Sequence, residues 1–246
     1  MKATEIYISE TPSTNALLKS YIQDKKLKDF TVLYTDHQTQ GRGQMGSSWS
    51  SAKGKNIACS VYKEFNGISI SDQFIISMLV SLALIDILEE LKVPKLKVKW
   101  PNDLYSSNKK IAGVLIETTM SGTKLSSAVI GIGLNLNQKE FEGLPHASSV
   151  LNLTGKLIDR SHVVQLIIKK LASRFKMIPV GFQQIKAEYE SHLYRKDKVS
   201  LFKGEQIGTV NGIIKGINEK GQLLIDIDQQ GVLKFNLKEV ELLSSN

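Results

Sequence analysis

The sequence of 246 residues has little cysteine, with Cys59 as its single one. A lone cysteine excludes an intramolecular disulfide and a cysteine-rich zinc site, and its place in the apolar run 57–61 is typical of a buried side chain. Two serines and an aspartate break the longest apolar segment, residues 74–88, so we expect no membrane span. The N-terminus lacks a basic segment followed by an apolar core, so no signal peptide is predicted. Together these absences favour a cytoplasmic protein.

Acidic residues are fewer than basic ones. The 24 aspartates and glutamates against 32 lysines and arginines give a net charge of +8. Such a balance permits nucleic-acid binding without establishing it. The lysines are spread along the chain, and the densest clusters, at 25–28 and 95–99, are short. A solvated surface explains most of this charge, and an acidic partner protein or an anionic small ligand explains the remainder.

The apolar pattern predicts both strands and helices in the first four fifths of the chain. Strands are predicted at residues 5–9, 30–34, 56–62, 95–100, 103–105, 110–117 and 126–136, and helices at 14–22, 71–91, 161–177 and 182–193. Neighbouring strands read as hairpins and do not alternate steadily with helices. The predicted fold class is therefore α+β, with a mixed, mostly antiparallel sheet.

The pattern changes after residue 194. Short β-rich runs lie at 198–202, 206–217, 222–228 and 231–236, separated by glycine-containing turns. They predict a small all-β barrel of about fifty residues. Its charge is nearly balanced, with eight basic and seven acidic residues from Arg195 onward, so the excess positive charge lies before it. We therefore predict two domains, residues 1–194 and 195–246.

One run, residues 38–49, combines glycine, arginine and tryptophan: Gln-Thr-Gln-Gly-Arg-Gly-Gln-Met-Gly-Ser-Ser-Trp. Its three glycines free the backbone to approach a ligand closely. Arg42 offers a planar fork of donors for a carboxylate or phosphate, and Trp49 offers a large flat surface. Such a loop suits an anionic ligand such as a nucleotide, although its spacing does not match the P-loop pattern.

A second segment, Lys-Trp-Pro-Asn-Asp at residues 99–103, ends a predicted strand with several polar groups. Pro101 forces a turn, from which Asn102 and Asp103 can hold a sugar hydroxyl, an amide or a metal ion. A capped turn without a ligand is the alternative, since asparagine and aspartate are common in turns.

Two predicted strands carry glycines where a ligand would lie close to the backbone. Lys110 enters one strand and can reach along the sheet into a pocket, and Gly113 leaves room beside it. In the other, Gly131 and Gly133 clear a flat strip on one face, and Asn135 is predicted on the same face. The alternatives are a solvated lysine at a hairpin end and close packing of a helix on the strip.

Taken together and in this order, these segments resemble the biotin protein ligases. The resemblance rests on Ser-Thr-Asn at 13–15, the Gly-Arg-Gly loop with its tryptophan, the Lys-Trp-Pro-Asn-Asp-Leu-Tyr and Lys-Ile-Ala-Gly-Val-Leu-Ile-Glu segments, and Gly-x-Gly-Leu-Asn at 131–135. It covers essentially the whole chain. It implies a class II synthetase-like catalytic domain and a C-terminal SH3-like barrel. Lipoate ligases share the general fold without these motifs.

The resemblance implies a biotin--[biotin carboxyl-carrier protein] ligase, which activates biotin as biotinyl-5′-AMP with ATP and Mg²⁺ and transfers it to a lysine of the biotin carboxyl carrier protein. The implied catalytic residues are Lys110, Arg42 and Asp103, the last near the phosphates and the one implied candidate for handling Mg²⁺. The implied biotin-binding residues are Ser13, Thr14, Asn15, Gln38, Arg42, Gly43, Gln44, Lys110, Gly113, Gly131 and Gly133. The implied nucleotide-binding residues are Trp49, Asn102, Lys110 and Asn135. We expect the glycine-rich loop to close over the ligand.

The sequence departs from the family pattern at the loop, where Gln44 and Ser47 replace the second and third arginines of Gly-Arg-Gly-Arg-x-Gly-Arg. Glutamine brings no charge, so weaker retention of the adenylate is expected. The chain begins almost at the catalytic segment, so we expect no N-terminal DNA-binding domain and no DNA partner. A homodimer is compatible with the sequence. The alternatives are a lipoate or octanoyl ligase of the same fold and, from a different class, a basic nucleic-acid-binding protein, for which the balanced charge of the barrel is unfavourable.

Overall fold

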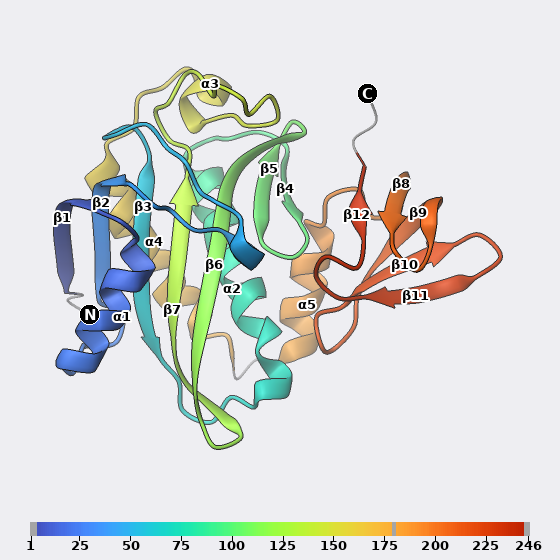
Figure 1. Ribbon diagram of the computed structural model, residues 1–246, viewed down its shortest axis with the longest axis horizontal. Helices are drawn as coiled ribbons and strands as arrows, with labels where there is room; N and C mark the ends of the chain where they lie inside the picture. The colour runs from blue at the N-terminus through green and yellow to red at the C-terminus, as the bar shows by residue number, and fades with distance from the viewer. Residues whose placement is uncertain (1–3, 179–180, 244–246) are drawn as a thin grey trace.

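The computed structural model describes residues 4–178 and 181–243. These residues form a seven-stranded sheet covered by helices and, towards the C-terminus, a five-stranded sheet beside it (Figure 1). The larger sheet contains β1 (Glu5–Thr11), β2 (Val32–Gln38), β3 (Ile57–Glu64), β4 (Leu96–Lys99), β5 (Asp103–Ser106), β6 (Lys109–Ser121) and β7 (Lys124–Leu134). The helices are α1 (Thr14–Asp24), α2 (Phe74–Glu90), α3 (Val150–Thr154), α4 (Arg160–Phe175) and α5 (Phe182–Ser191), with short 3₁₀ turns η1 (Gln44–Gly46) and η2 (Ile70–Asp72).

The order of strands in the larger sheet is β1-β2-β3-β7-β6-β5-β4. β1 and β2 are parallel because α1 connects them, and the remaining neighbours are antiparallel. The predicted α+β class with a mixed, mostly antiparallel sheet is therefore confirmed.

The alternation of side chains along β7 separates the two faces of the sheet. Ile130 and Ile132 point into the main hydrophobic core, which α2 and α4 cover. Val129 points to the other face and packs against Leu18 of α1. Gly131 follows Val129 on the α1 face, where the candidate site lies.

The helix α2 is apolar on nearly all sides. Within residues 4–178 and 181–243, one helical segment, residues 70–90, is long and apolar enough to span a membrane by length and composition. Here α2 lies behind the sheet and packs against α4 and α5 (Figure 1), and twelve of its residues are buried. Burial on all sides explains why this helix needs no polar face.

The C-terminal sheet contains β8 (Val199–Gly204), β9 (Gly208–Ile217), β10 (Leu223–Ile227), β11 (Gly231–Phe235) and β12 (Glu241–Leu242). Its strands follow the order β11-β10-β9-β8-β12 and are antiparallel. In the described residues β11 and β12 are the two ends of this sheet, and no ladder joins them, so a closed barrel is not found.

The C-terminal sheet is attached directly to the larger unit. The Trp100 indole N–H donates to the carbonyl of Gly221 at 2.9 Å, and the Ile217 N–H donates to the carboxylate of Glu190 at 2.8 Å. Phe202 and the other buried residues of the C-terminal sheet belong to the same hydrophobic cluster as α2 and α5. The two units therefore share one continuous core.

Candidate functional site

A cleft of about 200 Å³ opens on the α1 face of the sheet. It gathers side chains from the start of α1, the end of β2, the glycine-rich loop, the β4–β5 corner and the strands β6 and β7. The sequence-predicted residues that line it are Ser13, Thr14, Asn15, Gln38, Arg42, Gly43, Gln44, Trp49, Asn102, Asp103, Lys110, Gly113, Gly131 and Gly133. Segments separated by more than a hundred residues thus meet in one cleft.

The floor of the cleft is a strip of glycines. Gly113 of β6 and Gly133 of β7 are directly paired across the two strands, and the indole of Trp49 lies over both. A Cβ added at Gly133 would lie 2.6 Å from Cζ2 of Trp49, and one added at Gly113 would lie 3.2 Å from Cζ3. The glycines are therefore required for a flat aromatic group to approach the sheet.

The indole N–H of Trp49 is buried and has no hydrogen-bond partner in the described part of the chain. An unpaired buried donor costs about 1–3 kcal/mol. The ammonium of Lys110 lies 5.8 Å from the centre of the Trp49 ring, close enough for a cation–π contact. Trp49 thus places a free donor and a π-face inside the cleft, beside a cation.

A β-bulge directs Lys110 into the cleft. The pairing of β5 with β6 shifts between Leu104 and Tyr105, so that Leu104 faces Ala112 and Tyr105 faces Lys110. Ile111 is the extra residue, and it is buried in the core like Ala112. Strict alternation would place Lys110 and Gly113 on opposite faces, whereas the bulge places both in the cleft.

Lys110 forms an ion pair with Asp103, with 2.7 Å between Nζ and Oδ2. Both side chains are about one-third exposed or less, so their charges are only partly screened by water. The backbone of Lys110 is fixed on its other side, because its N–H donates to the carbonyl of His146 at 2.7 Å. Asp103 is the only carboxylate among the described residues that line the cleft.

The corner that carries Asp103 is supported from behind. The hydroxyl of Tyr189 in α5 donates to the carbonyl of Pro101 at 2.8 Å, and Tyr189 is fully buried. Asn102 is buried and donates from Nδ2 to the carbonyl of Val114 on β6. The Lys-Trp-Pro-Asn-Asp segment is therefore held as a rigid corner, with Asp103 facing the cleft.

The opposite end of the cleft holds neutral hydrogen-bonding groups. The N–H and the hydroxyl of Thr14 donate to Oε1 of Gln38 at 2.8 and 3.0 Å. The hydroxyl of Ser60 lies 2.7 Å from that of Thr14 and 2.5 Å from Oδ1 of Asn15, and Nδ2 of Asn15 donates to Glu117 at 2.7 Å. The start of α1 is thus fixed to β2, β3 and β6 by one polar network.

Sequence reasoning missed Ser60 and Glu117 in this network. Ser60 is a single hydroxyl inside the apolar strand β3, and it points to the same face as the cleft. A lone buried serine in an apolar strand needs a partner, and this was the available signal. Glu117 carries no such signal, because it reads as an ordinary charged residue near a strand end.

The glycine-rich loop lies over the cleft as a small hairpin. Arg42 and Ser48 form an isolated antiparallel bridge, and the N–H of Gly43 donates to the carbonyl of Ser47 at 2.7 Å. The tip is exposed, and Nζ of Lys238 in the C-terminal unit donates to the carbonyl of Met45 at 2.8 Å. Arg42 is exposed and forms no ion pair within residues 4–178 and 181–243, so its charge is available to an anion.

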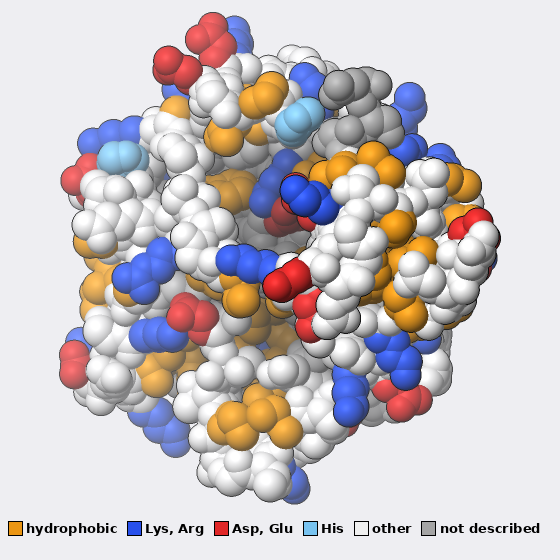
Figure 2. Space-filling view, turned by 45° about the vertical axis from the view of Figure 1, so that its right-hand side comes forward, with side chains coloured by type: hydrophobic (Ala, Val, Ile, Leu, Met, Phe, Trp, Pro, Cys, Tyr) orange, Lys and Arg blue, Asp and Glu red, His pale blue; other side chains and the backbone are white. Residues whose placement is uncertain are grey.

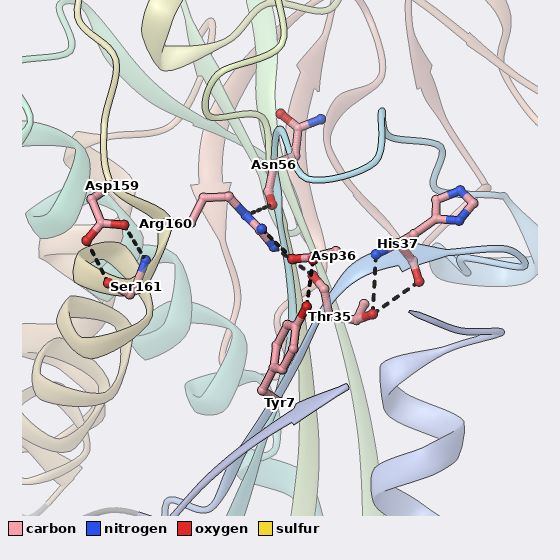
Figure 3. A network of polar contacts seen from close by, with 8 residues as sticks. All are labelled: Tyr7, Thr35, Asp36, His37, Asn56, Asp159, Arg160 and Ser161. Atoms are coloured by element: carbon pink, nitrogen blue, oxygen red, sulfur yellow. Dashed lines mark hydrogen bonds and ion pairs between the residues drawn. The ribbon is translucent and has the colours of Figure 1, made fainter. Parts of the chain in front are cut away.

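The end of β2, from which the loop departs, is anchored by Arg160 at the start of α4 (Figure 3). The guanidinium pairs with Asp36 at 2.5 Å and donates to the carbonyls of Thr35 and Asn56, each at 2.9 Å. Hydrogen bonds from Tyr7 and from Arg160 hold the pKa of Asp36 below its ordinary value. This network fixes the strand that presents Gln38.

Two further residues need a separate description: Asn135, which was predicted to bind the nucleotide, and Cys59, the single cysteine. β7 ends at Leu134, so the strand alternation does not extend to Asn135, which does not line the cleft. Its Nδ2 donates to the carbonyl of Ser148 at 3.0 Å. Cys59 borders the cleft but is buried, and burial raises the pKa of its thiol to about 12, which removes it as a nucleophile near neutral pH.

The cleft therefore has a neutral hydrogen-bonding end, a flat floor and a cationic end. Such a shape can bind a ligand with a polar head and a carboxylate next to a nucleotide. The described residues contain no group of three or more histidine, cysteine, aspartate or glutamate side chains that could hold a metal ion.

Comparison with known proteins identifies the family of this chain. The model of the biotin/lipoate A/B protein ligase family matches residues 7–135, more than half of the chain. The bifunctional ligase/repressor BirA of Bacillus spizizenii is 30% identical over 219 residues, which are 86% of this chain and 66% of that protein. This chain thus spans about two thirds of the length of that relative.

Two further relatives match over most of their length. The biotin--[acetyl-CoA-carboxylase] ligase of Mycobacterium tuberculosis is 29% identical over 232 residues, 92% of this chain and 84% of that protein. The structure of the biotin protein ligase from Aquifex aeolicus in complex with biotin and ATP matches with a TM-score of 0.80 at 29% identity, covering 98% of this chain and 99% of that one. With the cleft described above, these matches show that the chain belongs to the biotin/lipoate A/B protein ligase family.

Proposed function

We propose that this protein is an ATP-dependent biotin ligase, which forms biotinyl-5′-AMP and transfers the biotinyl group to a lysine of a biotin carboxyl carrier protein. The observation that carries the proposal is the cleft itself, in which the polar network around Thr14 and the cations Arg42 and Lys110 lie at opposite ends of one glycine floor. The similarity to a ligase solved with biotin and ATP supports this choice over a lipoate or octanoyl ligase.

The polar end fits the ureido head of biotin. A ureido group has a carbonyl acceptor and two N–H donors, and it needs both kinds of partner at short range. Ser13, Thr14 and Asn15 are each at most 4% exposed, so the groups that would bind it are already desolvated and fixed. Glutamine and hydroxyl groups supply donors and acceptors without a charge that would favour an anionic head.

The cationic end fits the first chemical step. An oxygen of the biotin carboxylate attacks the α-phosphorus of ATP, a new P–O bond forms, and the bond to the leaving pyrophosphate breaks. Two anions must approach each other, so positive charge fixed in advance lowers the barrier. Lys110 and Arg42 supply that charge, and Asp103 holds the Lys110 ammonium in place before the ligand arrives.

Mg²⁺ would accompany the nucleotide, and the carboxylate of Asp103 would hold it at this site. The fit rests on the chemistry of the donor, because Mg²⁺ prefers carboxylate and phosphate oxygens. When bound, the ion neutralises phosphate charge. Trp49 offers its π-face for the adenine and its unpaired N–H for an acceptor of the ligand.

The second step transfers the biotinyl group to the acceptor. The neutral amine of the carrier lysine attacks the mixed anhydride carbonyl, an amide bond forms, AMP leaves, and the amine loses a proton. Water must be excluded meanwhile, because it attacks the same carbonyl. The glycine-rich loop, which covers the cleft through Trp49, serves this purpose.

We also propose the finer features that the sequence predicts for the whole molecule. These are a division at residue 194, an SH3-like C-terminal unit, and a cytoplasmic location consistent with one buried cysteine. A homodimer is proposed too, for which β6 offers an edge, since β5 pairs with it only from Lys109 to Gly113.

The decisive test of the function is adenylate formation in the absence of any acceptor. The purified protein is incubated with biotin, ATP and Mg²⁺, and pyrophosphate and biotinyl-5′-AMP are measured. Lipoate and octanoate in place of biotin are the matched controls. We expect product with biotin alone, and absence of the adenylate with all three acids would overturn the proposal.

A further inference from the structure

A basic groove lies on the cleft side of the molecule, at the junction between β4, the β5–β6 turn and the chain that enters the C-terminal unit. We call it the β4 groove. It encloses about 820 Å³ and is lined among others by Lys95, Lys97, Tyr105, Tyr194, Lys196 and Lys198. None of these residues has a place in the proposed binding of biotin or ATP.

The charge of the β4 groove is predominantly positive. Five cationic side chains line it against two carboxylates, Glu190 and Asp197. Both carboxylates already have partners, because Asp197 pairs with Lys196 at 3.0 Å and Glu190 pairs with Lys186 at 3.6 Å. The groove therefore presents excess positive charge to a partner, and Lys95, Lys97 and Lys198 are exposed.

The β4 groove continues towards the candidate site on the same face of the sheet. Lys99 is paired with Asp103, and Lys97 with Tyr105, in the antiparallel ladder of β4 and β5, so these four side chains share one face. Asp103 is the cleft residue that pairs with Lys110. Lys99, Tyr105 and Tyr194 also line the adjoining hollow beneath the C-terminal unit.

The outer surface agrees with this arrangement. Figure 2 shows a hollow between the main body and the C-terminal unit, with both basic and acidic side chains at its rim. The rings of Tyr105 and Tyr194 lie 5.3 Å apart, and the ammonium of Lys99 lies 5.5 Å from the Tyr105 ring. Neighbouring rings between lysines give the groove apolar contact area as well as charge.

We propose that the β4 groove docks the acidic surface of the protein domain that carries the acceptor lysine. The inference rests on the proposed function and deepens it, because the second step needs a protein acceptor at the mouth of the cleft. Lys97 and Lys99 alternate on β4, which spaces their Cα atoms by about 7 Å. Carboxylates on one face of a strand or hairpin have the same spacing, so such a partner matches the row of charges.

The test separates docking from chemistry. Lys97→Glu/Lys198→Glu reverses two charges of the groove, and Lys26→Glu/Lys169→Glu reverses two exposed charges elsewhere as the control. Each protein is assayed for adenylate formation without acceptor, for transfer from the adenylate to hydroxylamine, and for transfer to the carrier domain of an acetyl-CoA carboxylase. The carrier reaction is measured at several salt concentrations.

We expect the groove variant to make adenylate and to react with hydroxylamine like the parent. Its KM for the carrier should rise about ten-fold at low ionic strength, with little change in kcat, and the difference should shrink as salt screens the charges. The control variant should keep the parent KM. Because Lys97 also donates to the carbonyl of Ser191 at 3.1 Å, Lys97→Gln/Lys198→Gln is used if the first variant does not fold, with a smaller rise in KM expected.

Two outcomes would overturn the docking proposal while leaving the ligase intact. One is an equal carrier KM for parent, groove variant and control at every salt concentration. The other is saturable binding of a DNA duplex that is lost in the groove variant while the carrier KM stays unchanged. Failure of the parent to make adenylate would instead refute the proposed function.

Discussion

Replacing Gly133 by alanine puts one methyl group into the floor of the cleft, directly beneath Trp49. The added Cβ would lie 2.6 Å from Cζ2 and 2.7 Å from Nε1 of the indole, about 0.8 Å inside the 3.4 Å at which ordinary contact begins. Backbone strain does not contribute, because Gly133 is not among the residues with positive φ. The nearest ring atom, Cε2, would lie closer still, so the indole must move by about an ångström.

The same substitution at Gly113 is the matched control. Its Cβ would meet Cζ3 of Trp49 and Oδ1 of Asp103, each at 3.2 Å, so shifts of a few tenths of an ångström relieve both contacts. A misplacement of about 1 Å can cost roughly 100-fold in rate, which is about 2.7 kcal/mol, whereas small shifts cost much less. We therefore expect kcat/KM for ATP to fall about 100-fold in Gly133→Ala and only a few-fold in Gly113→Ala.

The assay is pyrophosphate release at varied ATP and biotin, with the melting temperature measured beside it. Because the methyl groups displace the side chain of a loop with an exposed tip and not the hydrophobic core, we expect both variants to stay folded. Adding Trp49→Ala to each glycine variant completes a double-mutant cycle, in which the Gly133 effect should shrink because the clashing ring is gone. Equal losses at the two glycines, or additive effects in the cycle, would refute the reasoning.

Four further outcomes follow from single contacts. Lys110→Met should lower adenylate formation about 100- to 1,000-fold, with the melting temperature as the control for an intact fold. Gln44→Arg should slow release of the adenylate, since it returns a charge to the loop, and an unchanged off-rate would assign retention elsewhere. Lys238→Met should speed amide exchange around Met45, because it removes the 2.8 Å hydrogen bond that joins the loop to the C-terminal unit. Burial raises the pKa of Cys59 from 9.0 to about 12, so between these values the unfolded chain releases a proton that the folded protein keeps. The free energy of unfolding should therefore fall as pH rises from 9 towards 12. Cys59→Ser should flatten that slope in urea titrations.

Much of the larger unit could be predicted because its periodicity is local. The strands and long helices lie within a few residues of their predicted positions, since apolar alternation and helical spacing are properties of short windows. The short elements α3 and β12 were not predicted, because five and two residues carry too little periodicity. The predicted barrel is not confirmed, because no closed barrel is found in the described residues. Short strands show that a sheet forms but not whether its ends meet.

The residues of the site could be predicted from the sequence, but their positions relative to one another could not. Alternation would separate Lys110 from Gly113, and only the bulge at Ile111 brings them to one face. Asn135 lies just beyond the last residue of β7, where alternation no longer applies. Arg160 anchors Asp36 across 124 residues, and no local pattern records such a contact. The missed features are those that depend on pairing between distant segments.

These distant contacts also change the meaning of the boundary at residue 194. Lys238 holds the tip of the glycine-rich loop, and Gly221 accepts a hydrogen bond from Trp100 beside the Asp103 corner. The two segments that carry Arg42 and Asp103 are therefore each joined to the C-terminal sheet. Since the two units also share one hydrophobic cluster, a shift of the sheet would move the loop and the corner together. The C-terminal unit is thus part of the frame that sets the distance between the lid and the cationic end of the cleft.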